Sequence, residues 1–243
     1  MAMNPKLLRP KASGFNPKSI SGLKLWLDAT DSSTLTLNGS AVSEWRDKSG
    51  NDFHFSQGTS NNQPTYTATI NGKAAIAFDG TNDGLDRISV TNSSVANATG
   101  ACAFVVYEIS GTDSQSAAFR TSTSGSGHDR FNTTTFHAYF RSARLVSLSP
   151  APPSSGRVLL TSSSDVAADL QTLRVNGASL QTQSCASTFA TWRALSFATW
   201  SVGYDGSYLL GSVGEIIVIG RSVTPAEIAT VEKYLAKKWG VTL

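Results

Sequence analysis

The clearest hydrophobic pattern lies at the carboxyl-terminal end of the chain. Val213 to Gly220 is a β-branched apolar run bounded by glycines, which predicts a strand covered on both faces. Apolar residues then recur at helical spacing from Pro225 to about Trp239, with Thr224 as the N-cap and Gly240 as the stop. One stripe of this helix should face the protein body and contains Ile228, Val231, Leu235 and Trp239. The opposite face should lie in water and contains Glu232, Lys233, Lys237 and Lys238.

The rest of the chain has the period of short β-strands separated by polar turns. Gly22 to Asp28 alternates, with its three leucines on one face, and Ala101 to Ile109 is a nearly continuous apolar run typical of a central strand. Asn71-Gly72 and Asn176-Gly177 are hairpin-turn sequences. Turn signals recur about every ten residues. We therefore predict an all-β sandwich or barrel with one carboxyl-terminal helix over residues 225–239.

Composition and charge divide the chain into an arm and a body. With 243 residues, 40% of them hydrophobic, the chain can form one large β domain. Five of its 20 basic residues precede Asp28, and no acidic residue does, so the remainder has 15 basic and 17 acidic residues. We predict an extended basic docking arm over residues 1–20 and a folded domain over 21–243. The arm would contact a partner protein through Lys6, Leu7, Leu8, Arg9, Lys11 and Phe15.

Several classes of partner are not expected. The body offers no basic face interleaved with aromatic residues, which argues against nucleic-acid binding. Residues 1–24 have no continuous apolar core of signal-peptide length, and no run approaches membrane-spanning length, so we expect no membrane insertion. Cys102 and Cys185 would pair only if the fold brings them together, and buried thiols are the favoured interpretation.

A family resemblance follows from the order of several motifs. These are Leu25-Trp-Leu-Asp-Ala, Trp45-Arg-Asp-Lys-Ser-Gly-Asn51, Ala77-Phe-Asp-Gly-Thr-Asn-Asp83, Leu173-Arg-Val-Asn-Gly177, Gly214-Glu-Ile-Ile-Val-Ile-Gly220 and the helix that starts at Pro225-Ala-Glu-Ile. In this order they resemble the laminin-G-like, concanavalin A-like jelly-roll superfamily, most of all the versions in tailed-bacteriophage structural proteins and bacterial surface proteins. The resemblance covers about residues 20–243 and implies two antiparallel sheets with binding loops along one edge. Because this fold includes lectins, glycosidases and structural modules, it does not fix the function.

The sequence carries no clear catalytic signature. Retaining glycosidases of this fold place acidic residues at alternate positions of one strand, and no Glu-x-Asp-x-Glu pattern is present. Glu215 is a single acid in an apolar strand, for which we expect an arginine partner. His54, His128 and His137 lack metal-ligand spacing. We therefore expect a protein that is not an enzyme and needs no cofactor, with calcium as the one ion to test.

Two kinds of binding site remain as candidates. One loop contains several residues whose side-chain oxygens could bind calcium: Asp79, Asn82, Asp83 and Asp86. The alternative is that these residues form turns, in which their carboxylates accept backbone hydrogen bonds. Aromatic residues that would stack on a sugar, or else belong to the core, are Trp192, Trp200, Tyr204, Tyr208 and Tyr139, with Trp45 as a further candidate.

Three functions follow from these observations, in order of preference. The first is a virion structural protein of the bacteriophage head, neck or tail, multimeric on the particle and held to other virion proteins by the arm. The second is a glycan-binding adhesion module on a phage fibre or bacterial surface, with host polysaccharide as its partner. The third is a glycoside hydrolase, which needs two carboxylates about 5–10 Å apart across one groove. The corresponding location is the virion, or alternatively the extracellular space or bacterial cell surface.

Overall fold

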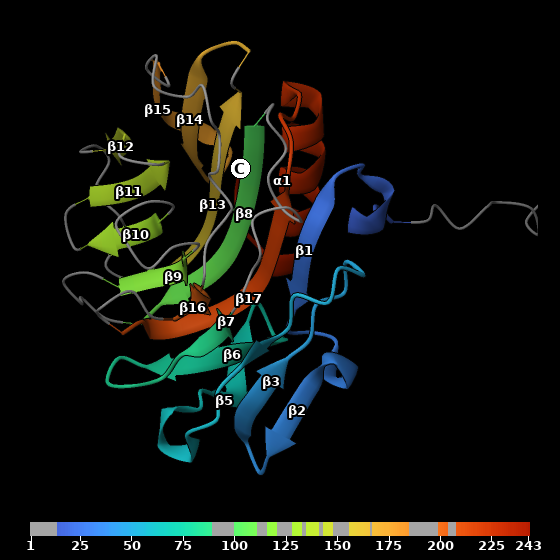
Figure 1. The fold of residues 1–243 in the computed structure, drawn as a ribbon, viewed down its shortest axis with the longest axis vertical. Helices are drawn as coiled ribbons and strands as arrows, with labels where there is room; N and C mark the ends of the chain where they lie inside the picture. Colours follow the sequence, from blue (N-terminus) through green and yellow to red (C-terminus); the bar gives the residue numbers. More distant parts are fainter. Residues whose placement is uncertain are drawn as a thin grey trace, which may run out of the picture.

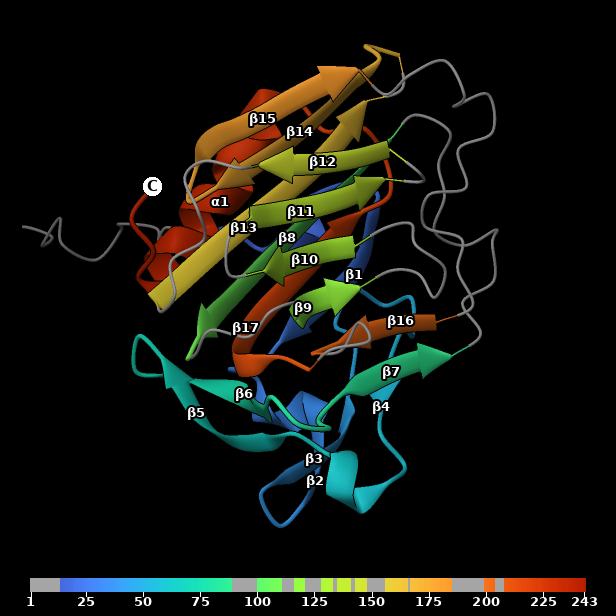
Figure 2. The ribbon, with the colours of Figure 1, turned by 90° about the vertical axis from the view of Figure 1, so that its left-hand side faces the viewer.

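A computed structural model describes residues 14–88, 100–110, 116–120, 128–132, 135–140, 143–147, 156–165, 167–184, 199–203 and 208–243. These residues form two layers of antiparallel β-strands, and a helix, α1 (Pro225–Trp239), covers the outer face of one layer (Figures 1 and 2). The β-sandwich with a carboxyl-terminal helix that the sequence predicts is confirmed. Short 3₁₀ turns occupy Pro17–Ser19, Ser32–Thr34 and Ser60–Asn62.

The helix-covered layer is built around β17 (Leu210–Ile219) and β8 (Gly100–Ile109), which pair with each other. Strand β13 (Gly156–Asp165) follows β8, and β14 (Leu170–Val175) and β15 (Ala178–Ser184) complete that side. The other edge of β17 pairs along its first half with β6 (Lys73–Asp79), the neighbour of β5 (Thr65–Ile70), and along its second half with β1 (Leu23–Asp28). One long strand therefore joins segments from both ends of the chain.

The second layer faces the first across the core. Its strands, in order of pairing, are β12 (Ala143–Ser147), β11 (Thr135–Phe140), β10 (His128–Asn132), β9 (Ser116–Arg120), β16 (Thr199–Val202), β7 (Leu85–Ile88), β4 (Phe55–Ser56), β3 (Ala41–Trp45) and β2 (Leu35–Asn38). A bridge between Ala41 and Thr65 links β3 to β5, so the two layers are continuous at one end.

Strand β17 is buried on both faces, as its apolar run predicts. Ile216 and Val218 point into the core between the layers, whereas Ile217 and Ile219 point into the core under α1. The pairing register shifts between Val213 and Glu215. Gly214 lies in this irregularity, and a Cβ there would come within 2.8 Å of the Trp239 ring, so only glycine lets the helix approach this closely.

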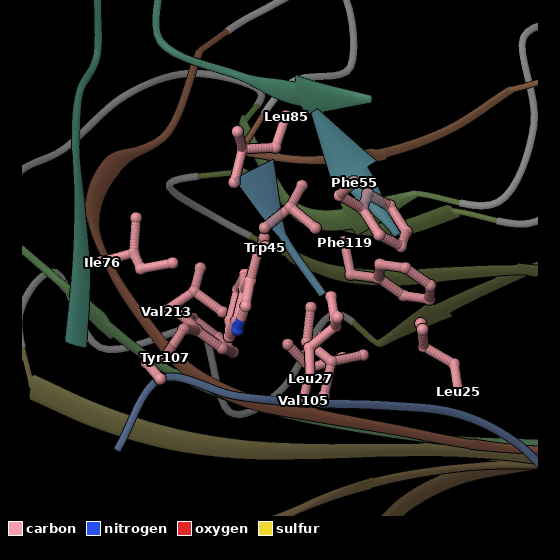
Figure 3. Packing of buried hydrophobic residues seen from close by; sticks show 14 of the residues in the cluster. Leu25, Leu27, Trp45, Phe55, Ile76, Leu85, Val105, Tyr107, Phe119 and Val213 are labelled. Atoms are coloured by element: carbon pink, nitrogen blue, oxygen red, sulfur yellow. The ribbon is translucent and has the colours of Figure 1, made fainter. Parts of the chain in front are cut away.

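The core between the layers contains most of the largest buried side chains, and Figure 3 shows how they meet. Trp45 from β3 lies beside Tyr107 from β8 and Val213 from β17, and all three are 0% exposed. The suggestion that Trp45 contacts a glycan is therefore wrong, because the indole is enclosed by both layers. Large aromatic side chains contribute the most apolar area to a sandwich core, which explains its place there.

Helix α1 has the predicted ends. The Thr224 side chain accepts a hydrogen bond from the Glu227 backbone, the Glu227 side chain accepts one in return, and Gly240 ends the helix with a φ of 68°. Its predicted apolar stripe is buried against β1, β8 and β17, together with Trp26 and Cys102. Cys185 lies outside the described residues. Among the described residues, no helix is long and apolar enough to span a membrane.

Three details of the predicted hydrophobic and polar pattern are wrong, two in α1 and one in β1. Glu232 and Lys238 were expected in water, but Glu232 is 2% exposed and accepts hydrogen bonds from the guanidinium of Arg174 at 2.8 and 2.9 Å. Lys238 enters a second buried cluster, described below. Leu23 packs under the helix instead of beside the other leucines of β1, because the register shifts just after it. For Glu232 and Lys238 a neighbouring strand supplies the partner, which helical spacing alone does not reveal.

The hairpin turns are as predicted. Asn71 and Gly72 have φ values of 52° and 69°, and Asn176 and Gly177 have values of 49° and 78°. Two consecutive positive φ values are those of a type I′ turn, which matches the twist of the flanking strands. The first turn places Lys73, at the start of β6, near α1, where it lines the pocket described below.

Candidate functional site

The aromatic residues predicted to contact glycans are only partly within the described structure. Trp192 and Tyr204 lie outside the described residues. Trp200 belongs to β16 and Tyr139 to β11, so both are in the second layer, three strands apart. Tyr208 precedes β17 and is half-buried. The sugar-stacking role of these five residues stays a prediction.

The loop with the predicted calcium ligands is held by its own backbone. One carboxylate oxygen of Asp79 accepts the N–H groups of Thr81 and Asn82 at 2.8 and 3.2 Å, and Asp83 accepts the N–H of Asp79 at 3.0 Å. Asp86 lies in β7, opposite Ser56. Among the residues that the structure describes, no group of three or more His, Cys, Asp or Glu side chains is arranged to hold a metal ion. A calcium site here stays a prediction.

A buried charged cluster lies under α1, and its central carboxylate belongs to Glu215. This side chain is 0% exposed and accepts hydrogen bonds from Trp26 Nε1, Trp239 Nε1 and Tyr234 Oη, each at 2.8 Å. The ammonium of Lys238 lies 2.7 Å from Glu215. The expected basic partner therefore exists, but it is a lysine from the helix and not an arginine.

Lys238 joins Glu215 to a second acid, Asp28, whose carboxylate is also 2.7 Å from the lysine Nζ. Asp28 accepts further hydrogen bonds from Thr30 and from Lys48, the latter at 3.0 Å. Asp28 and Glu215 are directly opposite each other on β1 and β17. Two carboxylates thus share one ammonium inside the protein, with several donors to each.

The environment shifts the pKa values of this cluster in opposite directions. Burial raises the pKa of Glu215, the charge of Asp28 raises it further, and Lys238 offsets only part of the rise. Burial also acts on Asp28, but hydrogen bonds from Lys238 and Thr30 outweigh it and lower the pKa of Asp28 below its ordinary value. Burial and the adjacent Glu215 raise the pKa of Tyr234, so its phenol keeps its proton and donates a hydrogen bond to Glu215.

A pocket of about 620 Å³ lies on the outer side of this cluster, between α1, the start of β6 and the chain just before β1. We call it the helix-side pocket. Its lining consists of Gly14, Phe15, Lys73, Thr230, Lys233, Tyr234, Lys237 and Lys238. The rings of Phe15 and Tyr234 have centroids 5.3 Å apart and are inclined at 56°. The lining therefore combines two aromatic rings and four basic side chains with the hydroxyls of Thr230 and Tyr234.

The buried cluster fixes the inner wall of the helix-side pocket. Tyr234 is held by its hydrogen bond to Glu215, and the Lys238 ammonium lies 5.7 Å from the Tyr234 ring centroid while bound to both acids. A half-buried aromatic ring whose hydroxyl is already bonded has little freedom to rotate. The pocket thus presents a preformed ring surface, as small-molecule sites usually do.

Sequence reasoning found only part of this site. Helical spacing does place both Lys233 and Tyr234 next to Lys237. Phe15 was assigned to the docking arm, yet it packs against the helix of its own chain. Nothing in the sequence places Lys73 beside that helix. The other predicted arm contacts lie outside the described residues: Lys6, Leu7, Leu8, Arg9 and Lys11.

Comparison with known proteins assigns the fold through solved structures. No protein-family model and no curated protein sequence matches the chain. Domain 4 of AbnA, a GH43 extracellular arabinanase from Geobacillus stearothermophilus solved in complex with arabinotriose, matches 86% of this chain and 97% of its own length. That match has a TM-score of 0.61 at 13% identity.

Two further matches are parts of larger chains. The botulinum neurotoxin serotype D ligand binding domain in complex with N-acetylneuraminic acid gives a TM-score of 0.64 at 14% identity over 91% of this chain and 54% of that one. The Trypanosoma rangeli sialidase in complex with 2,3-difluoro-KDN gives a TM-score of 0.60 at 12% identity, over 90% of this chain and 33% of the sialidase chain. The chain spans about half or less of these two, and identities this low show the β-sandwich fold alone.

Proposed function

We propose that this chain is a carbohydrate-binding β-sandwich module and that saccharides bind in the helix-side pocket. The observation that carries the proposal is the pair of rings from Phe15 and Tyr234 at the wall of a cavity that also presents polar groups. Sugar rings have apolar C–H faces that pack on aromatic side chains, while their hydroxyls bond to nearby polar groups. A volume of about 620 Å³ is within the range of about 300–1,000 Å³ of small-ligand sites.

The comparisons support this proposal from the side of the fold. The arabinanase domain and the neurotoxin domain were both solved with a saccharide ligand, arabinotriose in one and N-acetylneuraminic acid in the other. The shared sandwich makes carbohydrate binding a reasonable function to test for this chain, although fold alone does not determine function.

We propose binding without hydrolysis. The described lining of the helix-side pocket contains no carboxylate, whereas most glycosidases use two. Asp28 and Glu215, the acids that bind Lys238 of the lining, are 4% and 0% exposed, and donors from the protein occupy their oxygens. A carboxylate enclosed and bonded in this way stabilises the fold and does not meet a glycosidic bond.

The location of the module stays a prediction from the sequence resemblance. A bacteriophage virion and a bacterial surface both suit a glycan-binding module that contacts host polysaccharide. The arm hypothesis predicts that deletion of residues 2–13, which spares Phe15, abolishes incorporation into particles and leaves the unfolding transition unchanged. Equal incorporation of the truncated chain would contradict it.

The proposed function is tested with a glycan array followed by calorimetric titration of the best binder. Replacing Phe15 with alanine removes one ring of the pocket and should weaken binding by about two- to tenfold, the value of a single aromatic contact. The matched control is Leu37→Ala on β2, where an exposed apolar residue lies outside the pocket lining. The proposal fails if no neutral or acidic saccharide binds the wild-type chain, or if both variants bind alike.

A further inference from the structure

Three lysines around the helix-side pocket have no acidic partner among the described residues. Lys233 and Lys237 project from α1, Lys73 from the start of β6, and all three side chains are exposed. Lys238, the fourth lysine of the lining, is bound to Asp28 and Glu215. Three positive charges therefore remain available at the pocket after the protein's own pairs are formed.

Many other basic side chains of this protein, in contrast to these three lysines, form ion pairs with carboxylates. Six described lysine and arginine side chains lie within 4.0 Å of a carboxylate: Arg46, Lys48, Arg157, Arg174, Arg221 and Lys238. Their carboxylate partners come from several strands and from α1, so ion pairing is common in this fold. Against that background, three unpaired lysines around one cavity are a local concentration of positive charge.

The concentration of charge costs folding stability. Lys233 and Lys237 are four residues apart on the helix, a spacing at which like charges repel each other. Lys73 adds a third charge from another element. An anion in the pocket would relieve this repulsion and gain three ionic contacts, so negative charge on a ligand should raise its affinity.

We infer that the helix-side pocket selects saccharides that carry negative charge, such as uronic or sulfated sugars. This inference rests on the proposed carbohydrate binding and adds the chemical class of the ligand. The rings of Phe15 and Tyr234 contact the sugar face, and the ammonium groups of Lys73, Lys233 and Lys237 contact its carboxylate or sulfate groups. A long polyanion such as nucleic acid is disfavoured, because the chain from Asp28 onward has 15 basic and 17 acidic residues.

The experiment uses saccharide pairs that share one sugar backbone and differ in charge. Calorimetric titration compares hexagalacturonate with its methyl ester and, separately, a dextran sulfate oligosaccharide with dextran, so that carboxylate and sulfate are distinguished. The wild-type chain should bind at least one acid about tenfold or more tightly than its neutral counterpart. Raising the salt from about 0.1 to about 1 M shortens the Debye length from about 10 to about 3 Å and should remove most of this difference.

Charge-neutral variants locate the effect. Replacement of Lys73, Lys233 or Lys237 by glutamine should weaken binding of the acid by about two- to fivefold each, as exposed ion pairs do, and by at least about tenfold together. Binding of the neutral counterpart should not change. Lys18→Gln is the matched control, because Lys18 is exposed and lies outside the pocket lining.

Each outcome decides between the two proposals. Equal affinity for the acid and its neutral counterpart would overturn the inference and leave carbohydrate binding intact. If the triple variant still binds the acidic saccharide as tightly as the wild type, the acidic saccharide binds elsewhere, and the inference is also overturned. A single-stranded dodecathymidylate that binds as tightly as hexagalacturonate, and loses affinity equally in the triple variant, would show a general polyanion surface and overturn the inference. If no saccharide of any charge binds, the proposed function itself fails.

Discussion

The buried cluster makes one strong prediction about stability, tested by replacing Lys238 with methionine. Methionine keeps most of the side-chain volume and removes the ammonium that lies 2.7 Å from both Asp28 and Glu215. Asp28 retains its ion pair with Lys48 at 3.0 Å. Glu215 retains only neutral donors among its described partners, while its side chain stays fully buried.

Two estimates of the cost agree. Removing one partner of a buried ion pair generally destabilises a protein by about 3–5 kcal/mol. Glu215 can alternatively take up a proton, and bringing a carboxyl group with an ordinary pKa of 4.5 to its protonated form at pH 7 costs about 3.4 kcal/mol. Because a domain is stable by about 5–15 kcal/mol, either value is a large fraction of the total.

Protonation also gives the cost a pH dependence. In the variant, the folded state would hold a proton on Glu215 that the unfolded chain releases above its pKa of 4.5. The folded state then binds more protons than the unfolded state, so stability falls as the pH rises through this range. The free energy of unfolding of the variant should therefore fall by about 2.7 kcal/mol between pH 5 and pH 7, at about 1.36 kcal/mol per pH unit.

Urea unfolding followed by tryptophan fluorescence measures both quantities, because Trp26 and Trp239 bond to Glu215. Lys237→Met is the matched control, since Lys237 is exposed and its loss should change stability by no more than about 0.5 kcal/mol. Equal stability of the two variants would refute the role of the cluster. A large loss with no pH dependence would mean that Glu215 stays ionised on its neutral donors.

Three further predictions concern other charged groups. Arg221 lowers the pKa of Glu227 to about 2, so Glu227→Gln should reduce the free energy of unfolding by about 1–2 kcal/mol at pH 7. In a pH series of melting temperatures, the difference between variant and wild type should disappear as the pH falls from 4.5 toward 2. Burial and the neighbouring Asp79 raise the pKa of Asp83 to about 6. In urea unfolding, Asp83→Asn should therefore increase the free energy of unfolding by roughly 1 kcal/mol at pH 7 and leave it unchanged near pH 4. A calcium-dependent rise in the melting temperature of the wild type, absent from the variant, would instead support the predicted calcium site. Arg174→Met leaves Glu232 buried without its cation and should cost roughly 3 kcal/mol in the same assay.

The sequence by itself determines the elements of this fold that depend on local chemistry. The capped helix, the double-faced strand β17 and the two Asn-Gly hairpins each follow from residues close together in the chain. Their hydrophobic periods also fix which side chains of α1 are apolar and buried. Even the need for a partner on Glu215 follows from an acid in an apolar run.

Only the tertiary structure decides which distant residues become neighbours. Helical spacing assigns Lys238 and Glu232 to the solvent-exposed face of α1. In the structure, Lys238 instead pairs with acids on adjoining strands, and Glu232 pairs with an arginine on another strand. The helix-side pocket joins Phe15, Lys73 and Lys237 from three separate parts of the chain. Contacts between such segments depend on strand register and helix placement, and no local pattern encodes them.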